Sequence, residues 1–362
     1  MTPLKRRRFP VHRAAMALLY GDPVPSFAAA GISNPRYVFD TAAGRYLLLA
    51  FVPAGPDVDR AVETIERRRP AFDDLHASAF VVIVGKDRGR KRRKDSLPGL
   101  RFLFDEDGAI AALYGAPEVG RWHLVDPALH LLASVGVDQA DALVDRLAGL
   151  PPPGLHGGQE GSAPVLLTPR IFEPEFCAGL IAHYRRIGGR PSGFMREVDG
   201  VTTLMTDENH KRRSDVIIED ETLRKQLVAR LNRRLIPQIE KAFHFRATRI
   251  ERYLVARYDA ATGGFFRPHR DNTTRGTAHR RFAVSINLNA DYDGGDLRFP
   301  EYGPKTWRPA PGGAVVFSCS ILHEATPVTR GERFAFLPFL YDEDAARIRQ
   351  ENLKYLDPAL TA

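Results

Sequence analysis

The sequence has very little cysteine and no long apolar run. Cys177 and Cys319 are its only cysteines, so neither a disulfide framework nor a structural zinc site built from several cysteines can form. No apolar stretch approaches the roughly 20 residues that a membrane-spanning helix needs. We therefore expect a cytoplasmic protein that makes no membrane contact.

Positive charge exceeds negative charge, and the formal net charge is +8. Part of the excess is the run RGRKRRK, residues 88–94, which could contact a nucleic acid or an acidic protein. The run contains no interleaved aromatic residues, which is more typical of a solvated loop. Nucleic acid is therefore not an expected partner.

The chain of 362 residues is long enough for two domains. Residues 150–164, LPPPGLHGGQEGSAP, are rich in proline and glycine and show no periodicity, which predicts a linker. This places one domain at residues 1–149 and a second domain at residues 165–362.

The first domain shows short apolar runs separated by a helical pattern. Residues 46–53 and 80–85 read as buried parallel strands. Between them, Val58, Val62 and Ile65 lie on one face of a helix expected within residues 58–76. Two further strand segments follow, each with an Asp-Gly or Asp-Pro turn signal, so the pattern predicts an α/β fold that closes with a hairpin.

This order resembles the peroxiredoxin branch of the thioredoxin fold, on the segments GDPVPSF (residues 21–27) and AFVPAGPDVDRA (residues 50–61). The family's peroxidatic cysteine would fall at Arg60, and its threonine at Asp57. Because no cysteine precedes Cys177, the domain lacks a thiolate nucleophile. A redox-inactive domain that serves docking, dimerisation or support is therefore expected.

The second domain shows a helix followed by alternating strands. Leucine and isoleucine recur at helical spacing within residues 221–243. In the strand FAVSINLN, Phe282, Val284, Ile286 and Leu288 share one face, and Ala283, Ser285, Asn287 and Asn289 share the other. The first face predicts packing on the long helix, and the second predicts a polar cavity. Arg333 occurs in the apolar strand RFAFLPFL and should need a carboxylate partner.

Three side chains with metal-ligand character occur on either side of these strands. His269 lies two residues before Asp271, and His323 lies ten residues before Arg333. Two imidazoles and one carboxylate form the ligand set of non-heme Fe(II) oxygenases. A His-x-Asp pair alone carries little information. The prediction of a metal site depends on the residues around the pair, which include Tyr258 and the strands GGDLRF and GGAVVFS.

Over residues 164–342 the sequence resembles the Fe(II)/2-oxoglutarate dioxygenases of the prolyl 4-hydroxylase-like branch. The resemblance implies a double-stranded β-helix, or jelly roll, in which His269, Asp271 and His323 hold Fe(II). It implies that Arg333 binds the distal carboxylate of 2-oxoglutarate. The remaining candidates for contact with this cosubstrate are Tyr258, Asn287, which replaces a tyrosine used by some members, and Ser285.

The reaction implied by this resemblance consumes O2 and 2-oxoglutarate, releases succinate and CO2, and hydroxylates a C–H bond. Ascorbate is a candidate reductant. A peptide, a protein or an amino acid is the expected substrate, and the polar segment 192–214 is a candidate lid. A homodimer is left open.

The sequence is also compatible with two other functions. The chain could be a non-catalytic scaffold or a sensor of iron and 2-oxoglutarate that uses its first domain for docking. It could also be a nucleic-acid demethylase or hydroxylase that contacts phosphate through residues 88–94.

Overall fold

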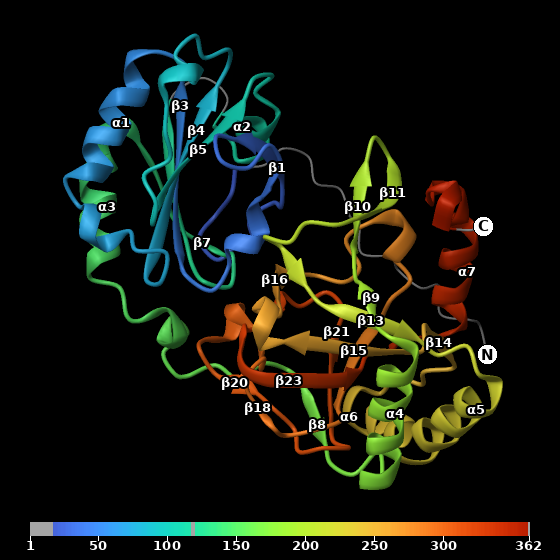
Figure 1. Ribbon diagram of the computed structural model, residues 1–362. Helices are drawn as coiled ribbons and strands as arrows, with labels where there is room; N and C mark the ends of the chain where they lie inside the picture. Colours follow the sequence, from blue (N-terminus) through green and yellow to red (C-terminus); the bar gives the residue numbers. More distant parts are fainter. Residues whose placement is uncertain (1–16, 117–119, 361–362) are drawn as a thin grey trace, which may run out of the picture. The chain divides into compact units, whose positions relative to one another are not determined.

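The computed structural model describes residues 17–116 and 120–360. The chain divides into two compact units, Met1–Gly161 and Ser162–Ala362, and each is described by itself (Figure 1). The division falls inside the proline- and glycine-rich segment 150–164. In the part of the chain that the structure describes, no helix combines the length and the apolar character needed to cross a membrane.

The first unit is built around a seven-stranded sheet of order β2-β1-β5-β4-β3-β6-β7. Its strands are β1 (Ala28–Gly31), β2 (Tyr37–Val38), β3 (Tyr46–Pro53), β4 (Ala77–Val84), β5 (Leu100–Asp105), β6 (Arg121–Val125) and β7 (Leu131–Gly136). Strands β3, β4 and β5 are parallel, and the hairpin β6–β7 adds to β3 in antiparallel fashion. The expected α/β sheet with a closing hairpin is confirmed, and the more specific peroxiredoxin-like assignment stays a prediction.

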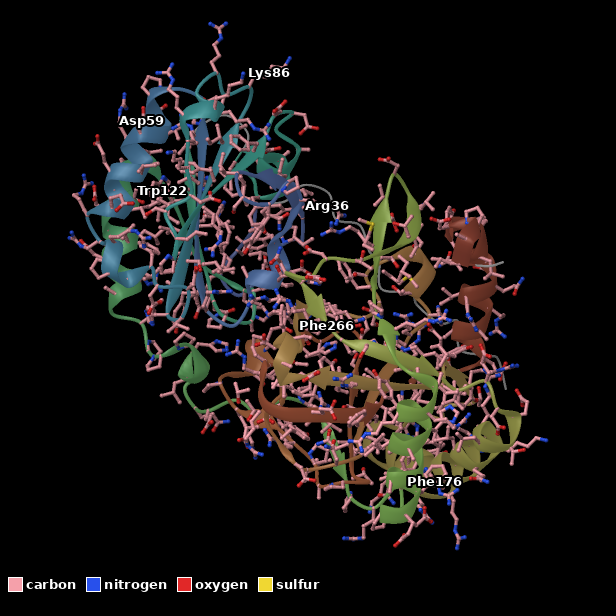
Figure 2. All side chains as sticks on the ribbon, in the orientation of Figure 1. Arg36, Asp59, Lys86, Trp122, Phe176 and Phe266 are labelled. Carbon is pink, nitrogen blue, oxygen red and sulfur yellow. The ribbon has the colours of Figure 1, made fainter. Side chains whose placement is uncertain are left out.

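Both faces of this sheet are buried, which explains the continuous apolar runs of its strands. On β3, Leu48 and Val52 pack in the cluster that contains α1 (Pro56–Glu66) and α3 (Ala140–Ala148). Leu47 and Leu49 of the same strand pack on the other face, in the cluster that contains α2 (Ala109–Leu113). Trp122, labelled in Figure 2, belongs to the first cluster.

Helix α1 carries Arg60 where the peroxiredoxin resemblance expects a thiol. Val58 and Ile65 of this helix are buried, as predicted. The helix ends at Glu66, well before residue 76, and Pro70 follows in a 3-10 turn. Arg60 is largely exposed and pairs with Asp57 at 3.0 Å.

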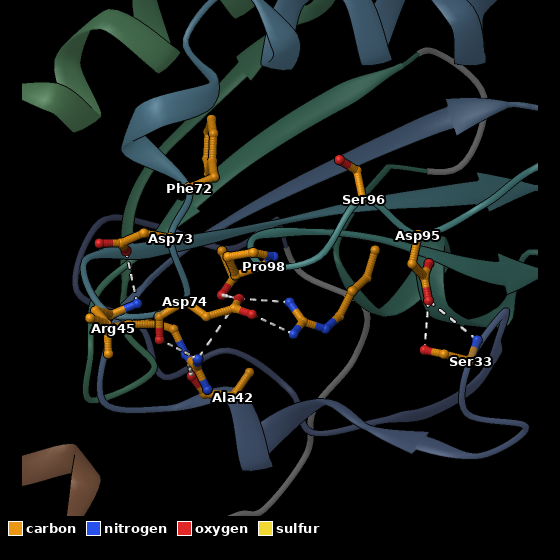
Figure 3. A network of polar contacts seen from close by, with 12 residues as sticks. Ser33, Ala42, Arg45, Phe72, Asp73, Asp74, Asp95, Ser96 and Pro98 are labelled. Atoms are coloured by element: carbon orange, nitrogen blue, oxygen red, sulfur yellow. Dashed lines mark hydrogen bonds and ion pairs between the residues drawn. The ribbon is translucent and has the colours of Figure 1, made fainter.

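Polar contacts hold the loops beside this sheet, and Figure 3 shows part of that network. Asp74 accepts hydrogen bonds from Arg101 at 2.7 and 2.6 Å and from Ser78 at 2.6 Å. Although burial opposes ionisation, the hydrogen bonds from Arg101 and Ser78 lower the pKa of Asp74 to about 2. In the nearby basic run, Arg90 pairs with Glu106 and Arg93 with Asp87.

The second unit consists mainly of two antiparallel sheets. The larger sheet has ten strands, and the smaller sheet has the order β12-β16-β22-β19-β20. The larger sheet contains β8 (Leu166–Thr168), β9 (Arg190–Pro191), β13 (Ser214–Ile217), β14 (Arg249–Glu251), β15 (Leu254–Asp259), β17 (Phe282–Asn287), β18 (Tyr292–Gly294), β21 (Ala314–Ser318), β23 (Val328–Phe336) and β24 (Phe339–Tyr341). The smaller sheet contains β12 (Lys211–Arg212), β16 (Phe265–His269), β19 (Leu297–Arg298), β20 (Thr306–Trp307) and β22 (His323–Ala325).

The two sheets share an apolar core, which is the layering expected of a jelly roll. Ala256 of β15 and Ala325 of β22 belong to one shared cluster. Phe317 of β21 and Leu297 of β19 belong to another. The predominantly β architecture predicted for this unit is confirmed.

Helices cover the outer face of the larger sheet (Figure 1). They are α4 (Pro174–Ile187), α5 (Glu221–Arg230) and α6 (Ile236–Phe243), and α7 (Glu343–Asn352) follows the last strand. Val284 and Ile286 of β17 pack against Leu227 and Leu235 of the long helical segment. The predicted helix-facing side of the strand is therefore confirmed. Of the residues predicted to face a cavity, Ala283 and Ser285 line one, whereas Asn287 and Asn289 do not.

The helical segment 221–243 contains an irregularity that the apolar spacing alone does not predict. A π-helical turn, Leu231–Leu235, separates α5 from α6. Pro237 lies in the first turn of α6. Because proline has no N–H to donate to the preceding turn, a local widening of the helix at this point is expected.

The segment 192–214, predicted to be an aperiodic lid, is largely β-structure. Strands β10 (Phe194–Val198) and β11 (Val201–Met205) form a two-stranded hairpin that projects from the rest of the unit (Figure 1). Asp199 and Gly200 at its tip both have positive φ, 50° and 78°, as a type I′ turn requires. The Asp-Gly pair between residues that favour strands was the sequence signal for this hairpin.

Candidate metal and cosubstrate site

Two adjacent strands of the smaller sheet place the two histidines side by side. His269 ends β16 and His323 begins β22, and these residues are directly paired in the antiparallel register. Their ring centroids are 4.3 Å apart. Asp271 follows in a turn that is anchored by a hydrogen bond from its N–H to the carbonyl of Cys319 at 2.9 Å. The pairing of β16 with β22 thus brings His323 beside two residues from which it is distant in the sequence.

The three side chains present ligand atoms to one common point. One nitrogen or oxygen atom from each of His269, Asp271 and His323 lies within 4.8 Å of the others. His269 Nε2 is 3.6 Å from Asp271 Oδ1, and His323 Nε2 is 3.3 Å from Asp271 Oδ2. These separations are suited to three ligands that share one metal ion.

Backbone carbonyls fix the orientation of both imidazoles. His269 Nδ1 lies 2.7 Å from the carbonyl oxygen of Arg267, and His323 Nδ1 lies 3.0 Å from that of Ile321. A carbonyl oxygen can only accept, so each Nδ1 carries the proton and each Nε2 keeps its lone pair for a ligand. Burial, with a further contribution from His323, lowers the pKa of His269 to about 4. The ring is therefore neutral near pH 7, as metal binding requires.

Glu301 ties together the two segments that carry the ligands. Its carboxylate accepts hydrogen bonds from Arg270 at 2.9 and 3.1 Å and from the N–H of Leu322 at 3.0 Å. Arg270 lies between His269 and Asp271 in the sequence, and Leu322 immediately precedes His323. Glu301 is therefore a positioning residue for all three ligands, and the sequence alone did not identify it.

The three ligand residues open into a cavity inside the second unit. Tyr258, Ser285 and Arg333 line the same cavity. Its volume is about 50 Å³, several times the roughly 10–15 Å³ that one water molecule needs. Arg333 and Tyr258 are directly opposite each other on β23 and β15, so the predicted arginine and tyrosine are neighbours on the cavity wall.

Arg333 is almost fully buried, with 3% of its surface exposed. Its Nε donates to Asn287 Oδ1 at 3.2 Å, and its Nη2 donates to Ser285 Oγ at 2.8 Å. Both acceptors are neutral. Across residues 17–116 and 120–360, no carboxylate forms an ion pair with Arg333, so the partner predicted for this cation is not supplied by the described protein.

Asn287 lies behind Arg333 and does not contact the cavity directly. It is not one of the residues that line the cavity. Its amide nitrogen donates to the hydroxyl of Tyr292 at 2.7 Å and to the carbonyl of Pro309 at 2.9 Å. Both amide hydrogens are thereby used. Asn287 orients the guanidinium of Arg333 and has no hydrogen left to donate to a cosubstrate.

Two further arginines line the cavity, Arg213 and Arg252. Arg213 belongs to the segment 192–214 that was expected to form a lid, whereas the sequence patterns did not identify Arg252. Arg213 forms a bidentate pair with Asp215, with both distances 2.7 Å. Its Nη1 also lies 3.4 Å from the hydroxyl oxygen of Tyr258. Phe266, labelled in Figure 2, also lines the cavity and stacks on His269 with ring centroids 3.5 Å apart.

Neither cysteine lines the cavity. Both are buried and free. Burial raises the pKa of the Cys177 thiol to about 11 and that of Cys319 well above its ordinary value. Neither residue is a thiolate near neutral pH.

The second unit is similar in sequence to known hydroxylases. A family model described as the 2OG-Fe(II) oxygenase superfamily matches residues 253–341. A PKHD-type hydroxylase of Nitrosomonas europaea is 31% identical over 164 residues, which are 40% of this chain and 66% of that protein. A PKHD-type hydroxylase of Stutzerimonas stutzeri is 36% identical over 97 residues, which are 24% of this chain and 43% of that protein. The chain thus spans less than two thirds of each of these relatives.

Two solved structures are similar to parts of this chain. A prolyl-4-hydroxylase of Pseudomonas putida has 22% identity and a TM-score of 0.40, over 50% of this chain and 94% of that one. A protein described as a putative thiol:disulfide interchange protein DsbE of Chlorobium tepidum has 19% identity and a TM-score of 0.31, over 37% of this chain and 98% of that one. From the family model and the curated relatives, we conclude that this chain contains a domain of the 2OG-Fe(II) oxygenase superfamily.

Proposed function

We propose that the chain is an Fe(II)- and 2-oxoglutarate-dependent hydroxylase. The observation that carries this proposal is the buried guanidinium of Arg333, which has neutral protein partners and lines the same cavity as His269, Asp271 and His323. An unpaired buried cation is costly. A dicarboxylate cosubstrate would supply the missing charge beside the metal ligands.

The residues of the site fit a ferrous ion. Two imidazoles and one carboxylate form the facial ligand set that leaves positions open for other ligands, and His269, Asp271 and His323 would hold the metal. With 2-oxoglutarate and O2, the bound metal supplies oxidative decarboxylation to succinate and CO2 together with hydroxylation of a C–H bond.

The cavity wall is arranged to orient the cosubstrate. Arg333 would bind the distal carboxylate, because Ser285 and Asn287 hold its guanidinium while its Nη1 keeps its hydrogens for a ligand. Arg213 donates to the oxygen of Tyr258, so the hydroxyl hydrogen of Tyr258 remains available to the same carboxylate. Phe266 and Phe317, which also line the cavity, would exclude water from the reacting groups.

The substrate class proposed from the prolyl 4-hydroxylase-like resemblance is a peptide or an amino acid. The hairpin β10–β11 is the proposed contact for this substrate outside the cavity. The first unit lacks a thiol, so we assign it a docking or supporting role.

The test is an assay of succinate formation by the full chain with Fe(II), ascorbate and 2-oxoglutarate, combined with calorimetric titration of 2-oxoglutarate. We expect the wild type to bind 2-oxoglutarate only when a divalent metal is present and to form succinate. His323→Ala should lose both properties.

Metal-independent binding of 2-oxoglutarate, or a rate of succinate formation in His323→Ala equal to that of the wild type, would contradict the proposal. A wild type that binds metal and 2-oxoglutarate but forms no succinate with any candidate substrate would instead support a sensor or scaffold.

A further inference from the structure

Arg252 contributes to the cavity a second cation that has no carboxylate partner among the described residues. It lies between β14 and β15, and its backbone is in the left-handed region, with φ of 53°. This conformation is uncommon for a residue other than glycine and occurs preferentially at functional sites. The Arg252 side chain stacks over Phe339 at 4.2 Å, and its Nε donates to the carbonyl of Leu337 at 3.3 Å.

The outer nitrogens of Arg252 have no hydrogen-bond partner among residues 17–116 and 120–360, and no carboxylate there forms an ion pair with this side chain. Nearby arginines differ in this respect. Arg213 is neutralised by Asp215, and Arg280 by Glu251, with distances of 2.6 and 2.9 Å. The side chain of Arg252 is therefore held by an aromatic ring and one carbonyl, with its two outer nitrogens left for a ligand.

The charges of the cavity indicate how many anionic groups it can accept. Asp271 is the only carboxylate among the described residues that line it, while Arg252 and Arg333 are the lining cations without a protein counter-ion. With a ferrous ion added, the net charge is +3. The dianion 2-oxoglutarate reduces it to +1, which leaves one positive charge for a second anion.

Arg252 is poorly placed to bind the same carboxylate as Arg333. Tyr258 lies opposite Arg333, and Arg252 precedes Tyr258 by six positions in the chain. The Arg252 side chain is held by Leu337 and Phe339, whereas the Arg333 side chain is held by Ser285 and Asn287. The two guanidinium groups are therefore fixed by different partners, and each can bind a separate carboxylate.

We propose that Arg252 binds a free carboxylate of the primary substrate, so that the enzyme acts on a small carboxylic acid such as a free amino acid. This inference rests on the proposed function and specifies its substrate class. An interior residue of a peptide has no such carboxylate, and burying its neutral amide against Arg252 would leave the cation uncompensated.

The test measures binding of a carboxylate probe in the presence of the cosubstrate. The full chain is loaded with Zn(II), which has no redox chemistry, and saturated with 2-oxoglutarate. Acetate and its neutral counterpart acetamide are then titrated and followed by ligand-observed NMR. The variants are Arg252→Gln and Arg252→Lys. The matched control is Arg224→Gln, because Arg224 also stacks on a ring, that of Tyr253 at 5.4 Å, and donates to a backbone carbonyl, but it does not line the cavity.

We expect the wild type to bind acetate and not acetamide. Arg252→Gln should weaken acetate binding by about tenfold or more, as expected for the loss of hydrogen bonds to a charged group. Arg252→Lys should retain part of the affinity, and Arg224→Gln should bind like the wild type. The affinity for 2-oxoglutarate should be the same in Arg252→Gln and the wild type.

Acetate binding that is absent from the wild type, or that survives Arg252→Gln, would overturn the inference while leaving the proposed function intact. A loss of 2-oxoglutarate affinity in Arg252→Gln would assign Arg252 to the cosubstrate and also overturn it. Failure of the wild type to bind 2-oxoglutarate would refute the proposed function itself.

Discussion

Replacing Arg333 by glutamine should separate ligand binding from protein stability. Within the part of the chain that the structure describes, Arg333 donates only to the neutral groups of Asn287 and Ser285. Each such bond contributes about 1.5–3 kcal/mol, because its donor is charged. Removing the buried cation also relieves its desolvation cost, which acts in the opposite direction. The free energy of unfolding of the ligand-free chain should therefore change by no more than about 1–2 kcal/mol.

The effect on cosubstrate binding should be much larger. Two charge-assisted hydrogen bonds to a carboxylate contribute about 1.5–3 kcal/mol each, so Arg333→Gln should weaken 2-oxoglutarate binding by roughly 10²- to 10⁴-fold. Isothermal titration of the Zn(II)-loaded chain measures this loss, and chemical denaturation of the ligand-free chain measures stability.

Arg280→Gln provides the contrast. Arg280 is buried and paired with Glu251 through two hydrogen bonds. Removing one partner of such a pair costs about 3–5 kcal/mol of stability. If Arg333→Gln destabilised the ligand-free chain as much as Arg280→Gln and left 2-oxoglutarate binding unchanged, Arg333 would be a structural residue and the reasoning would be refuted.

Three further predictions concern other parts of the molecule. Glu301→Gln should lower metal affinity about 10- to 100-fold in a Zn(II) titration, while an unchanged circular dichroism spectrum would show that the fold is retained. Removing the hairpin tip, residues 196–203, should spare metal and 2-oxoglutarate binding but reduce substrate-dependent succinate formation, and equal rates would exclude the hairpin from substrate binding. Burial lowers the pKa of His123 to about 4, below the ordinary 6.5. The free energy of unfolding should therefore fall by up to about 3 kcal/mol as pH falls from about 6.5 towards 4, because the unfolded chain takes up the proton first. His123→Phe should remove that part of the acid sensitivity in denaturation curves, and an unchanged pH dependence would contradict this assignment.

Strand periodicity predicted the parts of the site that depend on one strand at a time. The alternation in residues 282–289 placed Ser285 on the cavity face, and the structure has it there. The same rule placed Arg333 opposite Phe334 and Phe336, which pack beneath the helices. These predictions succeeded because side chains alternate along any extended strand, whatever its neighbours are.

Pairing between strands could not be read in the same way. Nothing in the local sequence states that His269 lies opposite His323, or that Glu301 reaches the segments on both sides of that pair. Arg252 lies an even number of positions before Tyr258, as a residue on the same strand face would. It precedes the strand, however, and has a left-handed backbone, so alternation alone did not place it in the cavity. The sequence therefore indicated the ligand types, while tertiary contacts determined the supporting residues.

The contrast between paired and unpaired arginines also bears on how ligands should stabilise this domain. Arg213 and Arg280 are compensated by Asp215 and Glu251 within the protein, so their contribution does not depend on a ligand. Arg252 and Arg333 lack such partners among the residues that the structure describes, so their desolvation cost is relieved only when anions bind. Binding to the folded state alone raises stability by mass action. Because different residues hold the two cations, stabilisation by 2-oxoglutarate should depend on Arg333 and the added stabilisation by a carboxylate substrate on Arg252.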